Sequence, residues 1–165
     1  MIIQFPESPE ELQPAGLLRR LAAMLYDTLI AVALMIITTG MYKMVQAKII
    51  GAEELKRLTE SGELITDPLL TSVLFITLYF FFAYFWTKTG QTLGMQVWHI
   101  RIQTSDGKSI RWSQALLRFM MAWVSFGCFG LGYLWSVRDK KHRSWHDHFS
   151  MSDVVRIPKR NKNKE

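Results

Sequence analysis

Residues 21–42 read LAAMLYDTLIAVALMIITTGMY, an apolar stretch that contains one charged residue, Asp27. About 20 apolar residues at about 1.5 Å each cover the hydrocarbon core of a bilayer, so this stretch is long enough to cross a membrane. A carboxylate inside such a span costs roughly 2.5–3.5 kcal/mol on insertion scales unless it finds a partner or water. The stretch therefore predicts an integral membrane protein whose working parts include Asp27.

Two further apolar blocks follow. Residues 69–87 carry no charge and predict a second span, whereas the uncharged block 119–137 contains three glycines. This last block is either one span or two half-helices that turn at the glycines. If it turns back, 16 of the 20 Lys and Arg residues lie on one side of the membrane, against 13 if it crosses. The positive-inside rule favours the turn, and 19 residues are too few for two full crossings. We therefore prefer a re-entrant hairpin.

The blocks predict an all-α integral membrane protein with three to four membrane helices, of which the last is re-entrant. Residues 97–112 alternate between apolar and polar side chains around Asp106-Gly107, which predicts a small β-hairpin at the membrane surface, with Arg101 and Gln103 on its polar face. The polar segment 46–68 has room for a short amphipathic helix. We divide the chain into a polar N-terminal tail (1–16), a membrane domain (17–155) and a basic C-terminal tail (156–165).

The net charge of +6 is concentrated after the last apolar block, where nine Lys and Arg residues follow Val137. Beside a membrane segment, such a tail indicates a cytoplasmic end that faces anionic lipid rather than a nucleic-acid partner. The N-terminal residues lack the basic start and apolar stretch of a signal peptide, so the first block is expected to be retained as a span. We expect a multi-pass plasma-membrane protein with its N-terminus and basic C-terminus in the cytoplasm.

Arg20 and Asp27 form the first candidate constellation. They are seven residues apart, two helical turns, so they share a helix face with their Cα atoms about 10 Å apart along the axis. In one interpretation, Asp27 titrates or binds an ion, and a movable Arg20 sets its state. In the other, a static ion pair fixes the first helix against its neighbours.

The second constellation lies in residues 140–150, KKHRSWHDHFS. His142 and His146 are four residues apart, which on a helix resembles the spacing of zinc ligands. No Glu stands beside the first histidine and no third ligand is evident, so we expect no metal site. Asp147 is instead expected to cap a helix or to pair with an arginine. No nucleophile has an adjacent base, so we expect neither an enzymatic activity nor a cofactor.

Residues 90–94, GQTLG, directly follow the second span. Gly90 and Gly94 bracket a tight turn, in which the side chains of Gln91 or Thr92 can satisfy loop backbone groups. The run lacks the Lys-Ser/Thr ending and the strand–helix context of a phosphate-binding loop. We therefore expect GQTLG to shape the chain after the span rather than to bind phosphate.

These motifs together resemble the RDD family of small bacterial membrane proteins, named for an arginine and two aspartates. AGLLRRLAAMLYD (15–27) is similar to the family's opening motif, which places its arginine on Arg20 and its first aspartate on Asp27. GQTLG matches the family's loop motif as it stands. LLRF (116–119) resembles the start of the following helix and places a further family arginine on Arg118.

SWHDHFSMSDVV (144–155) resembles the family's closing motif, which places the second aspartate on Asp147. Two positions depart from the usual pattern. Met95 stands where the family commonly has a lysine, and Met151-Ser152 stands in place of a Gly-Thr pair. The resemblance implies a multi-pass protein of the bacterial inner membrane, with ion or solute transport suspected for some members.

Two functions follow from these observations. The first is a proton-coupled cation or small-solute transporter that works as a homo-oligomer, because three or so spans are few for a carrier. Its ion-binding or coupling residues would be Arg20, Asp27 and Asp147, supported by Arg118, Gly90, Gln91, Thr92 and Gly94. The alternative is a non-catalytic accessory or scaffold protein that binds a partner through residues 97–112 and the basic tail. The expected partners are the lipid bilayer, monovalent cations or protons and further copies of the chain.

Overall fold

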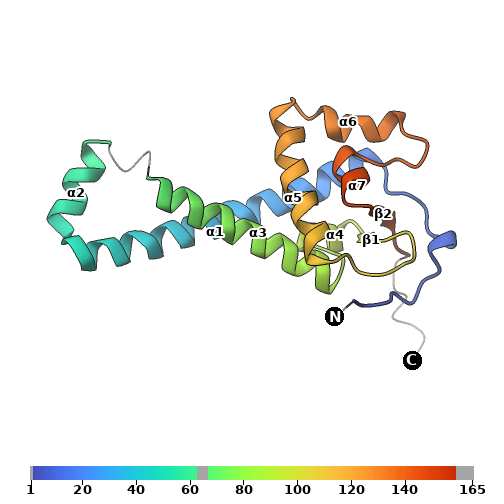
Figure 1. Ribbon diagram of the computed structural model, residues 1–165, viewed down its shortest axis with the longest axis horizontal. Coiled ribbons are helices and arrows are strands. Elements are labelled where there is room, and N and C mark those ends of the chain that lie inside the picture. Colours follow the sequence, from blue (N-terminus) through green and yellow to red (C-terminus); the bar gives the residue numbers. More distant parts are fainter. Residues whose placement is uncertain (1, 63–66, 159–165) are drawn as a thin grey trace. The chain divides into compact units, whose positions relative to one another are not determined.

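A computed structural model describes residues 2–62 and 67–158 of the 165-residue chain. The fold is mostly helical, with one two-stranded sheet (Figure 1). The predicted class, an all-α integral membrane protein, is confirmed, and its small β element is a two-stranded antiparallel sheet. In chain order, the elements are η1 (Pro9–Glu11), α1 (Leu17–Ile50), α2 (Ala52–Glu60), α3 (Pro68–Lys88), α4 (Leu93–Val97), β1 (Ile100–Gln103), α5 (Trp112–Gly127), α6 (Leu131–Arg138), α7 (Trp145–Phe149) and β2 (Asp153–Arg156).

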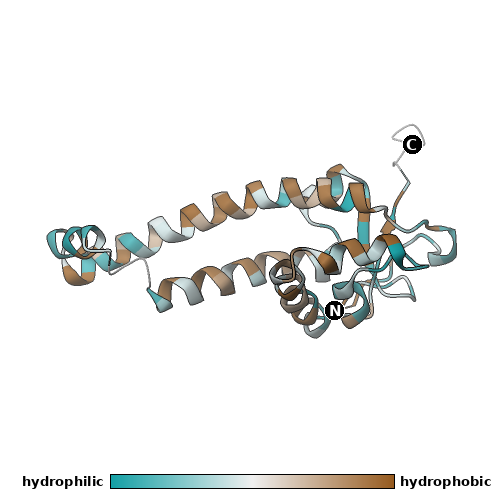
Figure 2. Ribbon diagram, turned by 90° about the horizontal axis from the view of Figure 1, so that it is seen from above, coloured by the Kyte–Doolittle hydropathy of each residue, from teal (hydrophilic) through white to brown (hydrophobic). Residues whose placement is uncertain are grey.

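Helices α1 and α3 are each long and apolar enough to cross a membrane. The colouring in Figure 2 shows hydrophobic residues along much of both helices. Helices α5 and α6 together form a third candidate, but a sharp bend of 100° separates them. The described residues thus hold two or three spans. The predicted break at the glycines is present, since Gly130 has a left-handed φ of 77° that a residue with a side chain adopts less readily.

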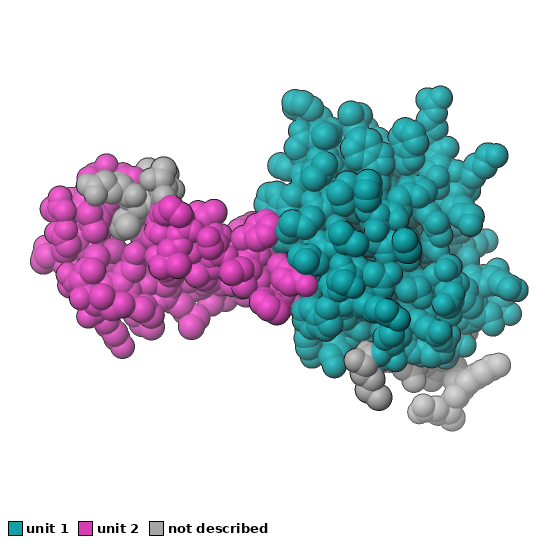
Figure 3. All heavy atoms as spheres, viewed as in Figure 1, with its two compact units in different colours: residues 1–27, 82–165 teal, residues 28–81 magenta. Residues whose placement is uncertain are grey.

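The chain divides into two compact units, residues 28–81 and residues 1–27 with 82–165 (Figure 3). The first of these contains α2, which confirms the short helix expected in segment 46–68. There the Asp67 carboxylate accepts hydrogen bonds from the backbone N–H of Leu69 at 3.0 Å and from the Tyr42 hydroxyl at 2.8 Å. It thereby caps the start of α3. The division into a tail, a membrane domain and a basic tail stays a prediction, and residues 159–165 lie outside the described residues.

The second unit contains the sheet. Strand β1 pairs antiparallel with β2, with Ile100 opposite Arg156 and Gln103 opposite Asp153. The predicted hairpin within 97–112 is therefore wrong about its second strand. The turn forms, with the Thr104 N–H donating to the Lys108 carbonyl at 2.8 Å, but the chain beyond it pairs with the N-terminal residues.

All four residues of β1 are buried, including the two predicted to face water. The N-terminal segment covers Arg101. The Arg101 guanidinium lies 4.0 Å from the centre of the Phe5 ring and donates to the Glu7 carboxylate at 2.8 Å. It also donates to the Gln103 amide oxygen at 2.9 Å, so both polar side chains of the strand have internal partners.

Backbone hydrogen bonds join the two ends of the described chain. The N–H of Ala15 donates to the Val154 carbonyl, and the N–H of Arg156 donates to the Gln13 carbonyl, each at 2.8 Å. Further along, the N–H of Ser109 donates to the Ile3 carbonyl at 2.8 Å. We refer to the segments joined in this way as the polar layer, which consists of residues 3–5, 13–15, 100–109 and 153–156.

Candidate functional site

Asp147 lies in the short helix α7 and is completely buried, with 0% of its surface exposed. Its carboxylate accepts hydrogen bonds from the backbone N–H of Ser144 at 2.9 Å and from the Ser144 hydroxyl at 2.6 Å. The Ser144 hydroxyl in turn completes a capping box at the start of the helix. Asp147 therefore fixes the first turn of α7, as expected of a capping residue.

Two arginines from distant elements converge on the same carboxylate. Arg20, from the first turn of α1, forms an ion pair with Asp147 Oδ2 at 2.5 Å. Arg118, from α5, forms an ion pair with Asp147 Oδ1. Both arginines are buried, and α1, α5 and α7 are thus joined at one point. We call Arg20, Arg118 and Asp147 the arginine clasp.

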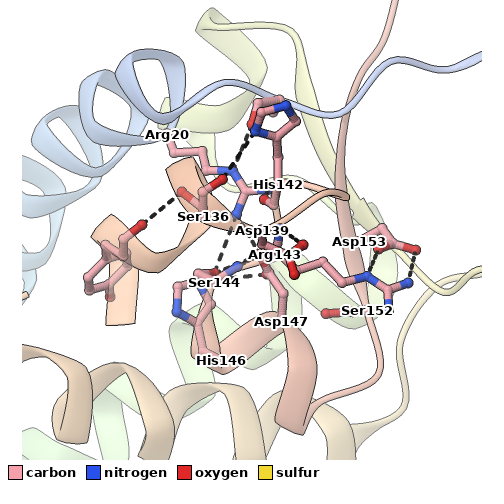
Figure 4. Close-up of polar contacts among 12 residues, drawn as sticks. Arg20, Ser136, Asp139, His142, Arg143, Ser144, His146, Asp147, Ser152 and Asp153 are labelled. Atoms are coloured by element: carbon pink, nitrogen blue, oxygen red, sulfur yellow. Dashed lines mark hydrogen bonds and ion pairs between the residues drawn. The ribbon is translucent and has the colours of Figure 1, made fainter. Parts of the chain in front are cut away.

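Both arginines also make contacts beyond Asp147. Arg20 donates to the backbone carbonyl of Ala15 at 3.0 Å. It also donates to the backbone carbonyl of His142 at 2.7 Å (Figure 4). Arg118 donates to the Ser152 hydroxyl at 3.0 Å, and its guanidinium carbon lies 5.5 Å from the centre of the Trp86 ring. A guanidinium presents its five donors in a fixed plane, so these partners determine the orientation of each arginine.

The charges of the clasp set the protonation of its neighbours. Burial raises the pKa of the Asp147 carboxyl, but interactions with Arg118, His146 and Arg20 outweigh it and hold that pKa well below its ordinary value. For His146, burial and the charge of Arg118 lower the pKa to about 3. Asp147 is therefore ionised and His146 neutral at physiological pH. The clasp holds two cations and one anion, which makes it a buried site of net positive charge.

Asp27 is the other buried aspartate, and its environment differs. Its carboxylate accepts a hydrogen bond from the Thr92 hydroxyl at 2.5 Å and another from the backbone N–H of Gly94 at 2.9 Å. No Lys or Arg among the described residues forms an ion pair with it. The interpretation that pairs Arg20 with Asp27 is therefore wrong, because Arg20 points its guanidinium at Asp147 instead.

The GQTLG motif supplies both donors to Asp27. Thr92 caps α4, accepting from the N–H of Met95 at 3.3 Å while its own proton goes to Asp27. Gly94 has no room for a side chain, because a Cβ there would lie 2.9 Å from the carboxylate of Asp27. Since both donors follow the end of α3, the Asp27 carboxylate lies near that end of the span.

The first two residues of GQTLG hold the loop against β1. Gly90 has a φ of +69°, and a Cβ added to it would lie 2.5 Å from the carbonyl oxygen of Ile102. Gln91 donates from its side-chain amide to the Ile100 carbonyl at 2.7 Å. Of the supporting residues named from the sequence, Thr92 and Gly94 thus contact Asp27, and Gly90 and Gln91 contact β1. Arg118 contacts Asp147 instead.

His142 and His146 do not share a helix face. His142 precedes α7 and has a left-handed φ of 53°. Its Nδ1 lies 3.1 Å from the Ser136 carbonyl oxygen, while His146 Nε2 lies 2.9 Å from the Ser144 hydroxyl. No group of three or more His, Cys, Asp or Glu side chains in the described part of the chain is arranged to hold a metal ion.

The Met151-Ser152 pair follows α7 and combines a left-handed backbone at Met151 with a buried hydroxyl at Ser152. Met151 has a φ of +49° and is 77% exposed, so a residue with a side chain occupies a position that glycine adopts without strain. Ser152 is buried and keeps a hydroxyl for Arg118. The contacts of Ser144, Ser152 and Trp86 with the clasp were not predicted from the sequence. For Ser144 a signal existed, since Ser followed three residues later by an acidic residue is a capping pattern.

Comparison with known protein families identifies the family of the chain. The model of the RDD family matches residues 14–151, most of the chain, and the match includes the arginine clasp and Asp27. No curated protein and no solved structure gave a significant match. The chain therefore belongs to the RDD family, and it is a membrane protein with apolar helices.

Proposed function

We propose that the protein is a proton-coupled transporter of monovalent cations or small solutes, and that Asp27 alone is its coupling carboxylate. One observation carries the proposal. Asp27 is buried in an apolar helix and accepts hydrogen bonds from neutral donors only, Thr92 and Gly94. A buried carboxylate with no positive partner in the described structure is stabilised by binding either a proton or a cation.

The two aspartates have separate roles in this proposal. Asp147 has two buried arginines as counter-charges and stays ionised, so it cannot exchange a proton near neutral pH. Asp27 has a hydroxyl and an amide N–H, both neutral. If a cation replaced the hydrogen bond between Thr92 and Asp27, the carboxylate oxygens of Asp27 and the hydroxyl oxygen of Thr92 would be its ligands. Hard cations prefer oxygen ligands of this kind.

Access also supports this assignment. Asp27 contacts the loop that follows α3, so in this proposal protons and ions reach it from the face of the membrane on which that loop lies. Opening toward the other face would need movement or further copies of the chain, so the proposal includes a homo-oligomer. It includes no enzymatic step. The excess of basic residues on the side of the polar layer supports the bacterial plasma membrane, with that layer in the cytoplasm.

The alternative is a non-catalytic accessory protein that binds a partner through the basic tail and residues 97–112. This segment already has partners within the chain, because β1 pairs with β2 and the turn after it pairs with the N-terminal residues. The transporter is therefore the better supported function, and the accessory role is the outcome expected if no transport is found.

The test is sodium- or potassium-driven proton movement in proteoliposomes, comparing the wild type with Asp27→Asn. The asparagine amide has the shape of the aspartate side chain, but it cannot exchange a proton for a cation. Flux should therefore fall to the level of empty liposomes. Asp153→Asn is the matched control, because Asp153 pairs with Arg143 in the polar layer and should leave flux unchanged. Wild-type flux retained in Asp27→Asn would refute the role of Asp27, and absence of wild-type flux across pH values and ions would refute transport.

A further inference from the structure

The apolar pair α5–α6 begins and ends beside the same hydrogen-bonded layer. Strand β1 and the turn at 104–108 precede α5, and β2 follows α7 after α6. Because β1 pairs with β2, the chain before α5 and the chain after α6 belong to one polar layer. Open strands and their loops are not stable in contact with lipid chains, so this layer must lie outside the hydrocarbon core, on one face of the membrane.

The clasp limits how far α5 can extend from that face. Arg118 in α5 is paired with Asp147 in α7 and donates to Ser152, the residue directly before β2, which places the first two turns of α5 beside the layer. Only residues 119–127 remain before the bend, and these cover about 13 Å at 1.5 Å per residue. One leaflet of the hydrocarbon core is about 15 Å thick. Helix α6 has 8 residues and turns away by 100°, so it does not continue α5 across the membrane.

Several large apolar side chains around the bend are exposed. Phe129 at its tip is 96% exposed and Phe126 is 73% exposed. Leu134 and Val137 on α6 are also exposed, and no charged residue occurs from 119 to 137. Arg138, Lys140 and Lys141 follow directly. An exposed apolar face bordered by basic residues fits acyl chains below a surface of anionic headgroups.

From these observations we infer that α5–α6 is a monolayer anchor: the bent pair enters one leaflet, on the side of the polar layer, and leaves by the same face. Its partner is the acyl region of that leaflet, with anionic lipid headgroups at its basic end. Among the described helices, α1 and α3 are then the only ones that cross the membrane fully.

The test uses single cysteines in the full chain after Cys128→Ser. Ser105→Cys, in the turn before α5, and Lys141→Cys, after α6, are both exposed. In sealed vesicles of uniform orientation, a membrane-impermeant maleimide should label both from the same side. Labelling from opposite sides would mean that α5–α6 crosses the bilayer and would overturn the inference.

Depth is measured with a nitroxide label on Phe129→Cys, with Leu134→Cys as a second position in case the first variant is not recovered. The label should collide more often with apolar oxygen than with a water-soluble nickel complex, at a depth between the headgroups and the midplane. A label on Ser105→Cys is the matched control and should meet the nickel complex. A Phe129 label that meets the nickel complex as readily as the control would refute insertion, whatever the outcome of the flux assay.

Discussion

Removing the charge of Asp147 tests whether the arginine clasp stabilises the fold. Asp147→Asn keeps the size of the side chain and leaves Arg20 and Arg118 buried without a counter-charge. Loss of one partner from a buried ion pair costs about 3–5 kcal/mol, because the remaining charge stays desolvated. We expect a loss at the upper end of this range, since two arginines lose the same partner and Asp147 has no exposed surface.

The assay is equilibrium unfolding of the purified protein in mixed micelles of increasing denaturing-detergent content. Asp153→Asn is the matched control, because its ion pair with Arg143 is partly exposed, with 24% of the Asp153 side chain accessible. Pairs nearer the surface contribute about 0–1 kcal/mol. If Asp147→Asn lowers the free energy of unfolding no more than Asp153→Asn does, the clasp does not hold the fold together.

A second substitution separates charge from packing. Arg118→Met removes one of the two buried positive charges and keeps much of the side-chain length. In the wild type, it should destabilise the protein, because it removes an ion pair with Asp147 and a hydrogen bond to Ser152. In the Asp147→Asn background, it should cost less or even restore stability, since it then removes an uncompensated charge. Additive effects would contradict an electrostatic clasp.

Three further predictions concern single positions. Gly94→Ala should destabilise the protein by about 1–3 kcal/mol in the same unfolding assay, since its Cβ would lie 2.9 Å from the Asp27 carboxylate. The control is Gly16→Ala, which should be nearly neutral because the space around Gly16 is open. Met151→Gly should stabilise it by about 1 kcal/mol by relieving a left-handed φ of 49°, and Met151→Ala should not. Because the pKa of His146 is lowered to about 3, the unfolded chain binds a proton below pH 6.5 that the folded protein does not, so stability should fall as pH decreases from 6.5 toward 3. His146→Gln should flatten that pH dependence, and an unchanged slope would place the titration elsewhere.

The sequence predicted the parts of the fold that depend on local composition. Uncharged stretches of sufficient length identified α1 and α3, and the glycines after Gly127 identified the bend between α5 and α6. Asp147 was expected to cap a helix or pair with an arginine, and it does both. These features depend on neighbours within a few residues, where periodicity and capping patterns are informative.

Pairing between distant segments could not be predicted in the same way. Spacing along α1 suggested Asp27 as the partner of Arg20, but the carboxylate that binds it lies 127 residues away. Likewise, the alternation of apolar and polar residues in β1 is compatible with any antiparallel partner strand. The turn at Asp106-Gly107 favoured the segment directly after it as that partner. The contact of Asp27 with Thr92 and Gly94 left no spacing signal, although the two motifs were each recognised. Only the folded structure shows that the GQTLG motif supplies the hydrogen-bond donors to Asp27.

The separation of Arg20 from Asp147 has a consequence for biosynthesis. Chains are synthesised from the N-terminus at about 5–20 residues per second, so Arg20 precedes its partner by about 6–25 s, given a separation of 127 residues. During that interval α1 and α3 can insert into the membrane. Residues 13–15 do not yet have β2 as their hydrogen-bonding partner, and the clasp does not yet have the carboxylate of Asp147. Completion of this unit is therefore a late event that follows membrane insertion. A chain that ends before α7 would expose an unpaired Arg20 and an unpaired β1 edge, and membrane proteases could use both to distinguish incomplete chains from finished ones.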